Sequence, residues 1–199
     1  MTQINWGLIG GGEGSQIGPA HRLGARIDGM YSFVAGALDV DAQRGKSFAR
    51  SLGVAEDRAY ANWQDMLEGE SNRPDGVKLV TVATPNQTHH PITKAFLQAG
   101  INVLCEKPLT TTVEEAQELV AIAKENNVIC AVNYGYSGYS LVRHARAMIA
   151  RGDLGKVHLV KAEFAHGFHA DASDADNPRV RWRYDPNACL LYTSDAADD

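Results

Sequence analysis

Two short polar segments combine residue types that suit acid–base chemistry. Glu106-Lys107-Pro108 directly follows one apolar run, and Thr84-Pro85-Asn86, with His89 three residues later, directly follows another. A lysine ammonium group can hold a substrate oxygen and exchange a proton with it. Taken singly, a lysine at such a place is most often only solvated. The segments therefore become informative only together with what the rest of the chain places beside them.

A glycine-rich turn, Gly10-Gly11-Gly12-Glu13-Gly14-Ser15-Gln16-Ile17-Gly18, separates the first apolar run from a helical pattern. A dinucleotide site needs glycine at the sharp turn, where the backbone approaches the pyrophosphate, and where helix packs on strand. Gly10 and Gly12 fit the first two positions of a G-x-G-x-x-G motif. Gly18 comes three residues late, which we interpret as an insertion in the loop. An ordinary glycine-rich turn explains the same residues equally well.

Asp39 stands at the end of the second apolar run, 21 residues after Gly18. An acid about 20 residues beyond the glycine motif typically binds the adenosine ribose of a dinucleotide. Its carboxylate would accept hydrogen bonds from the ribose hydroxyls and repel a 2′-phosphate, which favours NAD over NADP. Two alternatives stay open: Asp39 only begins the turn before a helix capped by Asp41, or Arg44 meets a 2′-phosphate.

The segments between these motifs alternate between strand and helix patterns. We expect strands at 4–9, 33–38, 77–83, 101–105 and 128–132, and helices at 17–28, 41–52, 63–68, 91–99, 112–126 and 141–149. Such alternation predicts an α/β fold, a doubly wound parallel sheet of the Rossmann type with helices on both faces. Because the carboxyl ends of parallel strands meet at one edge, the four motifs are expected in one crevice.

Composition and charge exclude several other classes of protein. The 199 residues carry a formal net charge of −5, and no apolar run approaches the roughly 20 residues of a membrane-spanning helix. The mild acidity argues against a nucleic-acid or anionic membrane partner. Three cysteines at unrelated spacings indicate no disulfide framework. Since the beginning of the chain also lacks a signal-peptide pattern, we expect a cytoplasmic protein.

The motifs together resemble those of the Gfo/Idh/MocA oxidoreductases, the group around glucose–fructose oxidoreductase and inositol dehydrogenase. The resemblance runs from about residue 4 to residue 187, and its matching stretches are Gly7-Leu8-Ile9-Gly10-Gly11-Gly12, Ala83-Thr84-Pro85-Asn86, Val103-Leu104-Cys105-Glu106-Lys107-Pro108-Leu109 and Gly152-Asp153-Leu154-Gly155-Lys156-Val157. Glu106-Lys107-Pro108 in this setting is more specific than the glycine turn.

The resemblance implies roles for particular residues. Lys107 would be the catalytic residue that contacts substrate beside the nicotinamide, and Glu106 would lie near the nicotinamide ribose. It also implies a cis peptide bond before Pro108. The predicted cofactor-binding residues are Gly10, Gly12, Gly18, Asp39, Thr84, Pro85, Asn86, His89, Glu106, Lys107 and Asn133. NAD is the expected cofactor, with NADP as the alternative.

The resemblance also predicts the domain organisation: an NAD(P)-binding domain at 1–133 and the start of an α+β substrate and oligomerisation domain at 134–188. For 189–199 we expect a non-native tail. Val160, Ala162 and Phe164 alternate with polar residues, as in a strand with one wet face. The Asp and His that the family carries, four residues apart, in its catalytic loop do not follow Trp182. The last eleven residues instead resemble a translated sequencing adapter, so we expect a truncated, impaired fragment.

The function predicted for the parent protein is NAD(P)-dependent oxidation of a hydroxyl group on a sugar, cyclitol or related polyol, by a homo-oligomer. An NAD-dependent glycoside hydrolase on the same fold and a non-catalytic nucleotide-binding module remain alternatives. His166, His169 and Asp171 have metal-ligating side chains. A loop histidine pair without a third placed ligand is far more often solvated, so no metal is expected.

Overall fold

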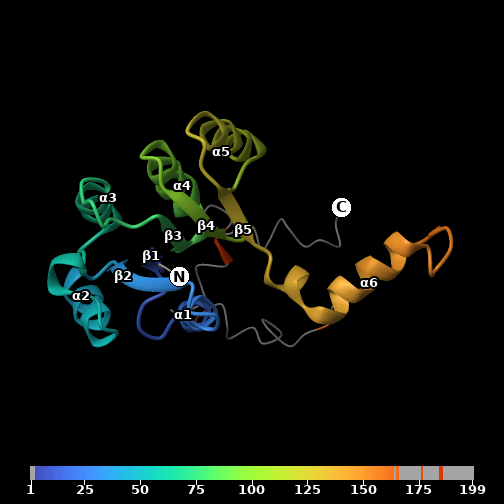
Figure 1. Cartoon of the computed structure of the whole chain (residues 1–199), viewed down its shortest axis with the longest axis horizontal. Helices are drawn as coiled ribbons and strands as arrows, with labels where there is room; N and C mark the ends of the chain where they lie inside the picture. The colour runs from blue at the N-terminus through green and yellow to red at the C-terminus, as the bar shows by residue number, and fades with distance from the viewer. Residues whose placement is uncertain (1–2, 164, 166–175, 177–183, 186–199) are drawn as a thin grey trace.

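The computed structural model describes residues 3–163, 165, 176, 184 and 185 (Figure 1). At its centre is a five-stranded sheet of order β2-β1-β3-β4-β5, in which every pairing is parallel. The strands are β1 (Ile4–Gly10), β2 (Tyr31–Ala37), β3 (Leu79–Ala83), β4 (Asn102–Glu106) and β5 (Cys130–Asn133). The α/β fold that the alternating patterns predict is confirmed.

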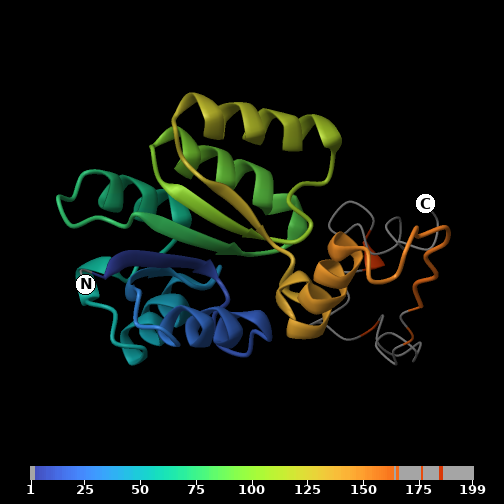
Figure 2. The ribbon, with the colours of Figure 1, turned by 45° about the vertical axis from the view of Figure 1, so that its right-hand side comes forward.

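Helices cover both faces of the sheet (Figure 2). One face carries α1 (Ile17–Arg26) and α2 (Ala42–Ser51), and the other carries α3 (Trp63–Ser71), α4 (His89–Gln98) and α5 (Val113–Glu125). Short 3-10 turns form η1 (Glu56–Arg58), η2 (Asn86–Thr88) and η3 (Gly135–Gly138). The last helix, α6 (Ser140–Arg151), extends beyond the sheet and has no buried residue (Figure 1). No helix in the described ranges is long and apolar enough to cross a membrane.

Each face of the sheet has its own buried cluster. Trp6 and Leu8 of β1 pack with Ala49 of α2, while Ile9 of β1 packs with Phe96 of α4. Alternate residues of β1 are thus buried on opposite faces, which is why this strand reads as a nearly continuous apolar run. Full burial of a side chain such as Leu8 or Phe96 stabilises the fold by about 1.5–3 kcal/mol.

Side-chain caps fix where two of the helices begin. Asp41 accepts a hydrogen bond from the Arg44 backbone nitrogen at 2.9 Å, as the cap of α2. Thr112 accepts one from the Glu115 backbone nitrogen at 3.2 Å, as the cap of α5 and the first half of a Thr112–Glu115 capping box. The reciprocal bond of that capping box differs, because the Glu115 carboxylate accepts from the backbone of Thr111, one residue before the cap.

The strand expected around Val160 and Ala162 is not formed. Residues 156–163 carry no regular secondary structure, and Phe164 lies outside the described residues. A strand is stable only beside another strand. The part of the chain that the structure describes places no strand beside this segment, so its alternating pattern alone does not produce one.

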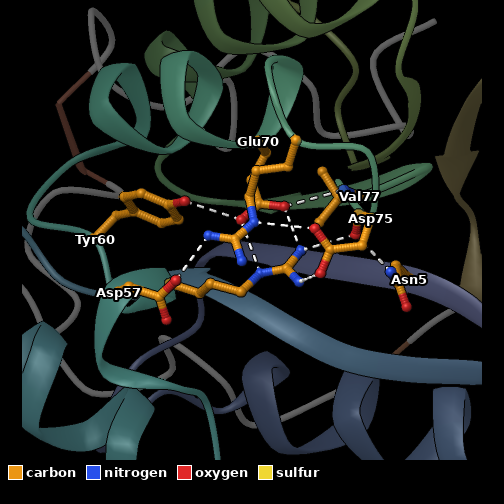
Figure 3. Close-up of polar contacts among 8 residues, drawn as sticks. Asn5, Asp57, Tyr60, Glu70, Asp75 and Val77 are labelled. Atoms are coloured by element: carbon orange, nitrogen blue, oxygen red, sulfur yellow. Dashed lines mark hydrogen bonds and ion pairs between the residues drawn. The ribbon is translucent and has the colours of Figure 1, made fainter.

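A network of charged side chains lies beneath α3, near the beginnings of β1 and β3 (Figure 3). The Arg58 guanidinium donates to both oxygens of Glu70, whose side chain is fully buried. Glu70 also accepts from the Tyr60 hydroxyl at 2.9 Å and from the Val77 backbone nitrogen at 3.0 Å. Burial, together with the hydrogen bond to Glu70, raises the pKa of Tyr60 to about 12. This network joins α3 to the sheet near the beginnings of β1 and β3, at the opposite end of the strands from the predicted motifs.

Candidate functional site

The sheet reverses its direction of growth at β1. The chain continues from β1 to β2 on one side and then to β3 on the other, so the segments after β1 and β3 leave the sheet in different directions. Ligands of open parallel α/β sheets bind in the crevice at such a switch point. The segments after β1, β2, β3 and β4 carry the four predicted motifs, which the fold therefore brings to one edge.

Three glycines of the turn stand where the backbone leaves no room for a side chain. Gly10 has a φ of +74°, and a Cβ there would lie less than 3.0 Å from the backbone oxygen of Ala83. A Cβ at Gly12 would meet the backbone of Leu38 as closely, and one at Gly18 would meet the turn itself. Gly18 thus stands where α1 packs on the turn, as the insertion interpretation requires.

The beginning of α1 suits a phosphate group. Its first turn carries no acidic side chain. Helix N-termini attract anions through free backbone N–H groups and the positive end of the helix dipole. The Ser15 hydroxyl accepts a hydrogen bond from the Gly18 nitrogen at 3.1 Å and keeps the loop against the helix. The residues present therefore fit a dinucleotide pyrophosphate.

Asp39 follows β2 beside the glycine turn, since a Cβ on Gly12 would lie 3.7 Å from its Oδ2. Arg44 holds both carboxylate oxygens, with Nε 2.7 Å from Oδ2 and Nη2 2.6 Å from Oδ1. The hydrogen bonds from Arg44 keep the pKa of Asp39 below its usual value. An ionised acceptor for ribose hydroxyls and a cation able to meet a 2′-phosphate thus stand in contact with each other.

Glu106, at the end of β4, is the meeting point of three elements. Its Oε1 lies 2.8 Å from His21 Nε2 of α1 and accepts from Asn133 Nδ2 of β5 at 2.6 Å. Burial would raise the pKa of this carboxyl, but the hydrogen bonds from His21 and Asn133 outweigh it and lower the pKa. Glu106 is therefore an oriented, ionised acceptor directly before Lys107.

His21 is a site residue that the sequence motifs did not single out. It stands three residues after Gly18, one helical turn inside α1. A residue at that spacing lies on the same helix face as the glycine that packs on the turn. That spacing was the one available signal, and it does not by itself predict a partner 85 residues away.

Lys107 is exposed, and its bond to Pro108 is cis, as the resemblance implies. Asn86 is buried at the beginning of η2. His89 is fully buried, and its ring nitrogens lie 2.8 Å from the Thr84 carbonyl oxygen and 2.7 Å from that of Pro108. These contacts are to the two loop segments, so a direct contact of His89 with a cofactor stays a prediction.

Several predicted features lie outside the described residues. These are the histidine pair with its aspartate, the segment around Trp182 and the adapter-like tail: His166, His169, Asp171, Trp182 and 189–199.

A doubly wound parallel sheet with a glycine cradle at its switch point defines the class of NAD-binding Rossmann domains. Residues 4–134 match the sequence profile of the oxidoreductase family GFO_IDH_MocA, described as having an NAD-binding Rossmann fold, and the chain belongs to this family.

Similar proteins agree with this assignment. An uncharacterized oxidoreductase, YfiI of Bacillus subtilis, is 44% identical over 92% of this chain and 47% of its own. An inositol dehydrogenase homolog from Azotobacter vinelandii, solved with NAD⁺, is 48% identical with a TM-score of 0.90, over 94% of this chain and 48% of its own. Levoglucosan dehydrogenase of Pseudarthrobacter phenanthrenivorans is 29% identical over 92% of this chain and 45% of its own. The chain thus spans about half the length of these relatives.

Proposed function

We propose that the protein is an NAD-dependent oxidoreductase that oxidises a secondary hydroxyl of a polyol, cyclitol or sugar. The observation that carries the proposal is the convergence, at one edge of the sheet, of the glycine cradle, Asp39 and the Glu106-Lys107 pair. Two relatives support the substrate class. The Azotobacter vinelandii homolog has been solved with NADH and myo-inositol, and another relative is named for levoglucosan.

The chain's own residues would divide the work between binding and proton transfer. The glycine cradle would hold the pyrophosphate, Asp39 the adenosine ribose and Glu106 the nicotinamide ribose. A bound nicotinamide would supply the hydride acceptor. Lys107, exposed beside Glu106, would hold the substrate oxygen and assist removal of its proton.

Substitution of Lys107 tests the catalytic assignment. Lys107→Ala should lower kcat at least about a hundredfold, the usual contribution of a positioned acid–base group. The dissociation constant for NADH should stay within about twofold, because the pyrophosphate and adenosine sites are intact. Lys78→Ala, an exposed lysine before β3, is the matched control. Turnover of myo-inositol is measured in the full-length protein that the gene encodes. Unchanged turnover of Lys107→Ala would reject the assignment.

Substitution of Arg44 tests the choice of cofactor. We propose NAD as the preferred cofactor, because the Asp39 carboxylate would repel a 2′-phosphate. Arg44→Ala should abolish any residual NADPH affinity and leave NADH affinity within about twofold. The control is Arg50→Ala. Arg50 lies elsewhere on α2, and its substitution removes an exposed ion pair with Glu56 of η1. If calorimetry showed that the wild-type chain binds NADPH more tightly than NADH, Arg44 rather than Asp39 would determine the choice of cofactor.

We also propose the domain division at 133/134 and a non-native origin of 189–199. β5 ends at Asn133, and α6, which follows, contributes nothing to the buried core. Limited proteolysis should therefore cut first after residue 133. Genomic sequence that continues through Asp198 into coding DNA would reject the non-native tail.

A further inference from the structure

His89 is the first residue of α4 and has no exposed surface. Its Nε2 lies 2.8 Å from the Thr84 carbonyl oxygen, and its Nδ1 lies 2.7 Å from the Pro108 carbonyl oxygen. Thr84 begins the segment after β3, and Pro108 follows Lys107 in the segment after β4. The ring therefore stands between the two loops of neighbouring strands that carry Asn86 and Lys107.

The two partners of the ring decide how it is protonated. A carbonyl oxygen only accepts hydrogen bonds, and a neutral imidazole has one N–H donor. Contacts of 2.7 and 2.8 Å to two acceptors are both favourable only if each ring nitrogen carries a proton. Burial and the positive end of the α4 dipole oppose this charge, whereas hydrogen bonds to two carbonyl oxygens favour it. A cross-link through both contacts therefore requires a proton on each ring nitrogen.

We propose that His89 is a positioning residue that cross-links the Thr84–Asn86 segment to the Lys107–Pro108 segment and so fixes Lys107 relative to the cofactor. In this proposal it acts through the two backbone carbonyls, in place of the direct cofactor contact that the sequence predicts. This inference rests on the proposed function, because the value of the cross-link lies in aligning a cofactor segment with a catalytic lysine. A misplacement of about 1 Å at such a site can cost a hundredfold in rate.

The neighbouring histidine provides a matched control. His90 lies on the same helix but bonds outward to Glu118 of α5, with Nε2 2.7 Å from the carboxylate. His89→Phe keeps a ring of similar volume and removes both hydrogen bonds. Calorimetry should show NADH binding weakened about tenfold in His89→Phe, the effect of about 1.4 kcal/mol, and changed by less than twofold in His90→Phe. The backbone amide signals of Asn86 and Lys107 should shift in His89→Phe and stay in place in His90→Phe.

Wild-type affinity in His89→Phe, with the amide signals of Asn86 and Lys107 unmoved, would overturn the proposal. If His89→Phe does not fold, the ring ¹⁵N spectrum of the unchanged chain decides. Two protonated ring nitrogens support the cross-link, and a single protonated nitrogen overturns it. A wild-type chain that fails to bind NADH would reject the proposed function, whereas the ring spectrum would still test the cross-link itself.

Discussion

Two buried glutamates at opposite ends of the sheet have very different surroundings. Glu70, in the last turn of α3, receives hydrogen bonds from Arg58, Tyr60 and the Val77 backbone, and its side chain is 0% exposed (Figure 3). Glu106, at the carboxyl end of β4, is 12% exposed. Its Oε1 accepts from Asn133 and contacts His21, whereas Oε2 has a single long contact, 3.3 Å from the Lys107 nitrogen. Among the described contacts, one carboxylate is saturated and the other keeps an acceptor position for a ligand.

The difference separates residues that hold the fold from residues that serve the site. Breaking a buried ion pair leaves an uncompensated charge and is strongly destabilising. A site carboxylate is held in place by fewer partners and keeps some hydrogen-bonding capacity for the ligand. We therefore expect mutations at the Glu70 end to change stability, and mutations at the Glu106 end to change cofactor binding.

The largest expected effect is at Arg58. Arg58→Met should lower the free energy of unfolding by about 3–5 kcal/mol, because Glu70 stays buried without its cation. Urea denaturation measures this, with Arg50→Met, at the exposed pair with Glu56, as a control that should change little. NADH affinity per folded molecule should stay the same. A near-neutral Arg58→Met would show that the network does not anchor α3.

The second-largest effect is expected at Glu106, where a substitution should change cofactor binding rather than stability. Glu106→Gln should change the free energy of unfolding by less than about 1 kcal/mol, since the amide fills the same space and retains an oxygen for Asn133. NADH binding should weaken about tenfold, the usual cost of losing one charge-assisted hydrogen bond. Calorimetry and urea denaturation together check both values. Unfolding as severe as that of Arg58→Met would remove the contrast between the two ends.

The smallest effects are in the pH dependence of stability. The pKa of Glu106 is lowered in the folded state, so its contribution is present above the unfolded value, about 4.3, and is lost as pH falls through the lower folded value. Tyr60 has the reverse sign. Its pKa is raised to about 12, so its contribution is present below about 10 and is lost as pH rises toward 12.

Urea denaturation at a series of pH values should show the free energy of unfolding falling at both acid and alkaline pH. Glu106→Gln should reduce only the fall at acid pH, and Tyr60→Phe only the fall at alkaline pH. If the fall at alkaline pH were unchanged in Tyr60→Phe, the hydrogen bond between Tyr60 and Glu70 would not contribute to the pH dependence of stability.

The fold could be predicted from the sequence because its signals are local. The apolar runs, the Asp41 and Thr112 caps and the glycines that follow α2, α4 and α6 can all be recognised within short stretches of sequence. The strand predicted around Val160 is wrong because alternation is a local signal, whereas a strand is stable only beside another strand.

The site could be predicted only in part, because its contacts join distant segments. The glycine turn, Asp39 and Glu106 follow strands, and the parallel topology brings them together. The bond between His21 and Glu106 and the His89 bridge depend on side-chain directions that spacing does not encode. The Asp39–Arg44 pair shows a further limit, because the sequence offered the two residues as alternatives and the structure places them in contact.

The most direct test of the account is a titration of the ¹⁵N-labelled chain with NADH, followed by NMR. The account predicts saturable binding with shifts at Gly10, Gly12, Asp39, Asn86 and Glu106, and unmoved signals at Tyr60, Glu70 and Val77. Absence of binding, or shifts concentrated at the Glu70 end, would contradict the claim that the carboxyl edge of this sheet is a dinucleotide site.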